Sequence, residues 1–148
     1  MKPRTRARSV ALQALYEVDI IGHPPGIVLE ERLFDNPLDE TLQEFARQIV
    51  FGVIPLTQKL DSLISEHAPE WPLDQVATID RNILRIALWE MVQRDKTPLK
   101  VAINEAVELA KVYGSDSTPR FVNGVLGSLA LHQNELIQAF EKLSQEEG

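Results

Sequence analysis

Apolar positions recur every three or four residues along nearly the whole chain, which is the spacing of one face of an α-helix. In residues 1–21 the apolar side chains form one stripe, while Arg6, Ser9, Gln13 and Tyr16 point roughly the opposite way. No segment alternates apolar and polar residues between hairpin turn residues, as a half-buried strand would. The pattern therefore predicts an all-α protein of about seven helices.

Proline and glycine mark the expected ends of these helices. The first predicted helix ends near the sequence GHPPG, and a short helix over residues 27–34 follows it. A longer helical segment runs from Asp39 to about His67, with Pro55 inside it. Because an interior proline removes a backbone hydrogen bond, we expect a kink or a break near residues 52–55.

The second half of the chain contains the most apolar segment. Residues 78–92 are apolar on almost every side and are predicted to form the central buried helix. A helix over residues 99–113 should follow, and then another that starts near Ser117 or Thr118. Residues 134–147 predict a short acidic helix at the end of the chain.

Length and composition favour one globular domain. The 148 residues are enough to bury a core, so we expect a single domain over residues 1–148, in which residues 132–148 are an acidic C-terminal helical extension. No window approaches the roughly 18–20 apolar residues of a membrane-spanning helix. The chain has no cysteine, which excludes disulfides and thiol nucleophiles and favours a cytoplasmic location.

The charge is unevenly distributed. Residues 1–16 carry +4 and no acid, so the remaining residues must carry -11 to give the net charge of -7. The four cations are Lys2, Arg4, Arg6 and Arg8. An acidic body repels nucleic acid, so any nucleic-acid site must be a local basic patch or be shared with a basic partner. From the residues alone, this cluster is either a phosphate-binding edge pointing away from the body or a solvated, frayed end.

A second candidate site lies in the sequence TPRFVNGVLG. Arg120, Phe121 and Asn123 fall in the first turn of a predicted helix, where free amides favour anions. Phe121 is a candidate stacking platform for a base, or an ordinary core aromatic residue. Gly124 and Gly127 weaken a helix, so we expect close backbone approach there.

Motifs for catalysis are absent from the sequence. There is no phosphate-binding glycine loop, no nucleophile elbow and no helix with paired histidine ligands. The three histidines, His23, His67 and His132, stand alone. The sequence therefore predicts no catalytic site, and no cofactor or metal site is expected.

Four motifs in fixed order carry a resemblance over about residues 1–130. They are RARSVALQALYE, DRNILRIALWE, VAINEAVELAKVYG and FVNGVLG. Together they resemble the bacterial NusB family of transcription antitermination factors. The resemblance implies two small helical bundles packed across each other and no catalytic activity. It also implies binding of boxA RNA in ribosomal RNA leaders together with NusE, a small-subunit ribosomal protein, within an antitermination complex on RNA polymerase.

The resemblance also implies roles for individual residues. The RNA contacts are expected at Lys2, Arg4, Arg6, Arg8, Arg120, Phe121 and Asn123. The NusE surface is expected at Tyr16 and Asp80, and Gln13 lies on the same predicted outer face as Tyr16. For Asp80 the competing interpretation is a charge that stabilises the dipole of the central helix. The resemblance leaves open whether the free protein is a monomer or a homodimer.

Two other interpretations remain open at this stage. One is an RNA-binding module related to that of ribosomal RNA cytosine methyltransferases, without catalytic activity because the chain has no cysteine nucleophile. The other is a helical scaffold that binds only protein, in which the basic end is merely solvated.

Overall fold

The computed structural model describes residues 1–93 and 97–147, with side chains up to residue 143. Within these residues the chain forms eight α-helices, two short 3₁₀ helices and no strand, which confirms the all-α prediction. The α-helices are α1 (Pro3–Ile21), α2 (Pro25–Asp35), α3 (Glu40–Val53), α4 (Thr57–His67), α5 (Thr78–Met91), α6 (Leu99–Tyr113), α7 (Thr118–Ala130) and α8 (Gln133–Glu147). In the described part of the chain, no helix is both long and apolar enough to cross a membrane.

Local sequence explains where the helices begin and end. Pro3 occupies the first turn of α1, where its missing N–H costs nothing. Gly22 ends α1 with a φ of 80°, a left-handed conformation that glycine adopts without strain. The Asp39 side chain caps α3 by accepting a hydrogen bond of 2.9 Å from the Leu42 amide. These signals are local, so sequence patterns could place them.

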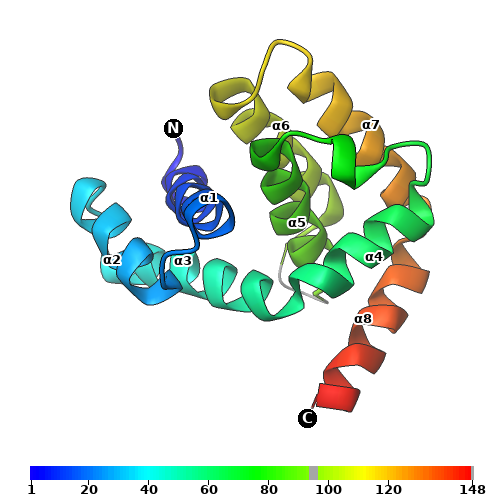
Figure 1. Ribbon diagram of the computed structural model, residues 1–148, viewed down its shortest axis with the longest axis horizontal. Helices are drawn as coiled ribbons and strands as arrows, with labels where there is room; N and C mark the ends of the chain where they lie inside the picture. Colours follow the sequence, from blue (N-terminus) through cyan, green and yellow to red (C-terminus); the bar gives the residue numbers. More distant parts are fainter. Residues whose placement is uncertain (94–96, 148) are drawn as a thin grey trace.

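The predicted break near residues 52–55 is confirmed. A 3₁₀ turn over Ile54–Leu56 contains Pro55 and divides the long helical segment into α3 and α4. This division raises the helix count from the expected seven to eight. In Figure 1 the segment from α3 to α4 follows one continuous curved path that joins the two halves of the molecule.

The helices form two bundles, as the resemblance implied. In the first bundle α1 packs against α2 and α3, and in the second α5 packs against α4, α6 and α7. The bundles meet where α5 contacts both α1 and α3. Helix α5 is buried along most of its length, as its apolar sequence predicted. Helix α8 follows α7 and docks through Leu136 and Ile137, both of which are buried.

An ion-pair network centred on Arg85 ties the bundles together. Its Nε and Nη2 atoms each donate to the carboxylate of Asp61 on α4 at 2.7 Å, and its Nη1 donates to Asp19 on α1 at 3.0 Å. Burial alone would lower the pKa of Arg85, but hydrogen bonds and charge from Asp61 and Asp19 raise that pKa above its ordinary value. One buried guanidinium therefore connects α1, α4 and α5.

Gly52 on α3 leaves space for the indole ring of Trp89 on α5. A Cβ at Gly52 would lie 2.5 Å from the Trp89 ring of α5. We expect Gly52→Ala to lower the free energy of unfolding by about 1–3 kcal/mol through overpacking, measured by urea denaturation.

Gly127 on α7 provides the matched control. A Cβ there meets no atom within 4 Å, so the expected close backbone approach is wrong at this position. We expect Gly127→Ala to stabilise the protein by up to about 1 kcal/mol, because alanine is the better helix former. Equal effects of the two substitutions would contradict the close packing of Trp89 on Gly52.

Candidate nucleic-acid interface

Three of the four N-terminal cations are exposed at the start of α1. Lys2, Arg4 and Arg6 lie on the surface and are called the cationic tip below. The guanidinium carbon of Arg4 lies 3.8 Å from the centroid of the Phe45 ring on α3. Arg6 donates through Nη2 to the carbonyl oxygen of Pro37 at 3.2 Å. The cationic tip is therefore an exposed patch of positive charge at the start of α1, on a protein whose other residues are net acidic.

Arg8 does not belong to this exposed set. Its side chain is 2% exposed, and its Nε and Nη2 atoms donate to the two carboxylate oxygens of Glu90 at 2.9 and 2.8 Å. A further nitrogen, Nη1, lies 3.6 Å from the carboxylate of Glu105 on α6. The prediction that all four cations point away from the body is wrong for Arg8, because its charge is committed to a buried ion pair.

The predicted outer face of α1 is also partly occupied by α6. Ser9 was expected to point outward but is buried and hydrogen-bonded to the Tyr113 hydroxyl. Gln13 is half-buried and donates to the same hydroxyl at 2.9 Å. Tyr16 is 40% exposed, so it remains available on the surface as expected.

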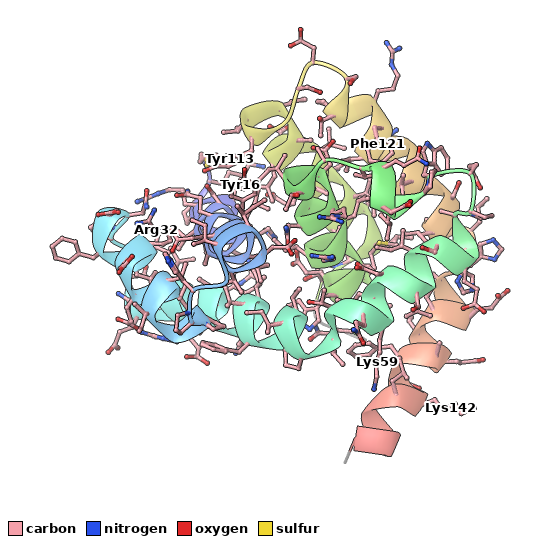
Figure 2. All side chains as sticks on the ribbon, in the orientation of Figure 1. Tyr16, Arg32, Lys59, Tyr113, Phe121 and Lys142 are labelled. Atoms are coloured by element: carbon pink, nitrogen blue, oxygen red, sulfur yellow. The ribbon has the colours of Figure 1, made fainter. Side chains whose placement is uncertain are left out.

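A cleft of about 540 Å³ opens beside Tyr16 where the two bundles meet. Figure 2 shows Tyr16 next to Tyr113, with Arg32 farther to the left, and all three residues line the cleft. Ile79, at the start of α5, contributes apolar surface to its wall. The lining also includes the carboxylate of Glu17, so it combines aromatic and apolar surface with charges of both signs, which suits a protein partner better than a phosphate backbone.

Asp80 links the first turn of α5 to the first turn of α7. Its carboxylate accepts from the Thr118 hydroxyl at 3.2 Å, and that hydroxyl in turn accepts from the Ser115 amide at 2.9 Å. Burial raises the pKa of Asp80, and the hydrogen bond from Thr118 partly opposes that rise. Through Thr118, Asp80 therefore stabilises the loop that precedes α7.

The first turn of α7 presents a mixed surface. Arg120 and Asn123 are exposed, while Phe121 is half-buried and packs against the core. The helix begins at Thr118 after Ser117, as predicted, with a proline in its first turn. Phe121 thus combines the two interpretations that its local sequence left open, since part of the ring packs inward and part faces solvent.

The two candidate RNA sites lie at opposite ends of α1. The start of α1 lies toward the end of α5 and the end of α1 toward the start of α5, because Arg8 pairs with Glu90 and Asp19 pairs with Arg85. Since Asp80 joins the start of α5 to α7, the α7 turn lies toward the Tyr16 end of α1. Twelve residues of α-helix separate Arg4 from Tyr16, or about 18 Å. The predicted RNA residues therefore form two separate surfaces.

Comparison with known proteins shows the family. Residues 5–131 match the model of the NusB family. The chain belongs to the NusB family.

Similar proteins cover nearly all of the chain. It is 48% identical to the transcription antitermination protein NusB of Roseiflexus castenholzii, over 89% of this chain and 94% of that protein. The NusB of Bacillus pumilus is 42% identical, over 93% of this chain and 99% of that protein. Among solved structures, NusB of T. maritima has a TM-score of 0.76 at 31% identity, covering 95% of this chain and 99% of that one.

A solved complex is also similar. A chain in the complex of antitermination factors NusB and NusE with double-stranded RNA has a TM-score of 0.76 at 28% identity, over 94% of this chain and 98% of that one. The NusB family match ends at residue 131, so α8 lies outside it, as do Lys2 and Arg4.

The sequence patterns missed several buried polar and charged residues of this NusB fold. Asn82, Arg85 and Glu90 are buried polar side chains on the otherwise apolar α5, and each has a partner on another helix. The signal was present, because isolated polar residues in a helix that is apolar all round must be paired to be tolerated. Among the described residues, no group of three or more histidine or acidic side chains is arranged to hold a metal ion.

Proposed function

We propose that this protein is a transcription antitermination factor that binds boxA RNA in ribosomal RNA leaders together with NusE. In this role it supports antitermination by RNA polymerase in the cytoplasm, where transcription takes place. The observation that carries the proposal is the similarity over 94% of the chain to a NusB solved together with NusE and RNA. The protein acts by binding alone, as one domain over residues 1–148 with residues 132–148 as an acidic extension.

The RNA is proposed to contact both exposed cationic surfaces. Lys2, Arg4 and Arg6 of the cationic tip supply phosphate contacts, which are set by charge and carry no sequence information by themselves. Arg120 and Asn123 on α7 add a second contact surface, and the exposed part of Phe121 can stack on a base. Arg8 is left out of this set because its guanidinium is buried against Glu90.

NusE is proposed to bind along the cleft beside Tyr16. Tyr16 offers an exposed ring, and Gln13 lies one helical turn away with its amide on Tyr113. Asp80 contributes by holding the loop before α7 and by its own carboxylate. These three residues lie where α1 meets the start of α5, so one partner can contact all of them.

The acidic body explains why a partner is needed. The four exposed cations proposed to contact RNA, on a chain of net charge -7, give weak RNA binding alone, because the acidic body repels phosphate. A basic partner seated beside α1 would extend the positive surface and add its own contacts.

Binding of labelled boxA RNA and of a scrambled strand, with and without NusE and across salt concentrations, tests the proposal. We expect a preference for boxA that is strongest with NusE and weakens as salt rises. Equal binding of the two RNAs under every condition would overturn the proposed function and favour a scaffold that binds only protein.

A further inference from the structure

The Arg4 side chain is held in place by an aromatic ring, unlike the other cations of the tip. Its guanidinium carbon lies 3.8 Å from the centroid of Phe45, well within the range of a cation–π contact. Phe45 is half-buried and packs against the core, so its position is fixed by α3. Arg4 itself is exposed. The guanidinium group is therefore ordered on the side that meets Phe45 and open toward solvent.

A cleft of about 500 Å³ opens beside this pair of residues. Its walls come from α1, α3 and the end of α5, and they include Trp89 and the amide side chains of Gln48 and Gln93. Glu44 and Glu40 add two exposed carboxylates to the rim. The cleft thus combines aromatic surface with groups that both donate and accept hydrogen bonds.

The charged groups that line this cleft determine whether it favours a phosphate group or a nucleobase. Arg4 can contact a phosphate at the rim, but the carboxylates of Glu40 and Glu44 outnumber it and oppose the entry of a phosphate into the cleft. A nucleobase carries no net charge, and its ring and exocyclic N–H groups can donate to a carboxylate or to an amide oxygen. Bases in single-stranded RNA stack on guanidinium planes as well as on aromatic rings. An unpaired base is therefore the part of an RNA strand that this cleft fits.

We propose that Arg4, resting on Phe45, is a stacking platform for one unpaired base of the bound RNA, whose edge enters the adjacent cleft. This inference rests on the proposed RNA-binding function and adds a recognition element to it. Lys2 and Arg6 contact phosphates, for which charge alone matters. Arg4 contributes a flat surface as well as charge, and Phe45 acts as a positioning residue that keeps this surface in place.

Exchange of arginine for lysine separates the two kinds of contact, because lysine keeps the charge and loses the plane. With NusE present, we expect Arg4→Lys to lower affinity for boxA RNA by about 5- to 100-fold, the range for loss of one base stack. The salt dependence of binding should stay unchanged. Arg47→Lys is the matched control, because Arg47 lies on α3 outside the proposed RNA surfaces and pairs with Glu30, and it should bind as the unaltered protein does.

The RNA side of the contact is tested by abasic substitution at each boxA position in turn. One position should weaken binding to the unaltered protein by a factor similar to that of Arg4→Lys, and should have little further effect on the Arg4→Lys protein. Phe45→Leu should produce the same pattern, with a thermal unfolding curve recorded to show that the variant is folded.

The outcomes distinguish this inference from the proposed function. If Arg4→Lys binds boxA RNA as Arg47→Lys does, and every abasic position affects the Arg4→Lys protein and the unaltered protein equally, the stacking platform is overturned while antitermination RNA binding stands. If the unaltered protein shows no preference for boxA RNA with NusE at any salt concentration, the proposed function fails first and this inference fails with it.

Discussion

Replacing Glu90 with alanine is expected to lower the free energy of unfolding by about 3–5 kcal/mol, because it leaves the Arg8 guanidinium buried without its main partner. Glu90 accepts three hydrogen bonds from Arg8 and a fourth from the Thr97 hydroxyl, and both members of the pair are 2% exposed. Glu105 remains 3.6 Å away and offsets only part of the loss. Urea denaturation measures the change, which corresponds to roughly 10 °C in Tm for a chain of this size.

The double substitution Arg8→Met with Glu90→Leu is the control for this prediction. It removes both charges and fills the space with apolar side chains, so its stability should lie much closer to that of the unaltered protein. If Glu90→Ala instead changes stability by less than about 1 kcal/mol, Arg8 must escape to solvent, and it would return as a candidate for RNA binding.

Removing the cationic tip is expected to give the largest effect on RNA affinity. In the triple variant Lys2→Ala, Arg4→Ala, Arg6→Ala, three phosphate contacts are lost, each contributing about 0.7 to the salt slope on single-stranded RNA. The slope should fall by about 2, and affinity at about 0.1 M salt should fall roughly 100-fold. A titration of boxA RNA with NusE, repeated across salt concentrations, gives both quantities.

A charge-matched variant shows whether the effect is local. Arg47→Ala, Lys59→Ala and Lys142→Ala change the net charge by the same amount on α3, α4 and α8. Figure 2 shows Lys59 and Lys142 in the lower part of the view, away from the labelled tyrosines. This variant should keep most of the RNA affinity and the salt slope. Equal losses in the two triple variants would mean that the overall field of the protein, and no specific tip, attracts RNA.

The fold was predictable because its signals are local and repeated. Helical periodicity, the break at Pro55 and the glycine after α1 each depend on neighbouring residues, and each matches the structure. The arrangement in two bundles came from the resemblance to the NusB family, since periodicity does not say which helices pack together.

The candidate site was predictable only in part. Arg8 precedes Leu15 by seven residues, so helical spacing alone places Arg8 on the buried stripe. The prediction that it faces outward relied on its charge instead. Its partner Glu90 lies 82 positions away, a pairing that only the folded chain reveals. The contact between Arg4 and Phe45 has the same character, because it depends on how α3 packs beside α1.

The two ion pairs that α1 makes with α5 fix its register. Arg8 is held by Glu90 near one end and Asp19 by Arg85 near the other, at points about 16 Å apart along the helix axis. Two ion pairs at separate points along α1 oppose both its translation and its rotation relative to α5. The distance between the cationic tip, proposed to bind RNA, and the cleft beside Tyr16, proposed to bind NusE, is thus fixed when the chain folds. Neither the RNA nor NusE loses binding free energy by ordering this arrangement.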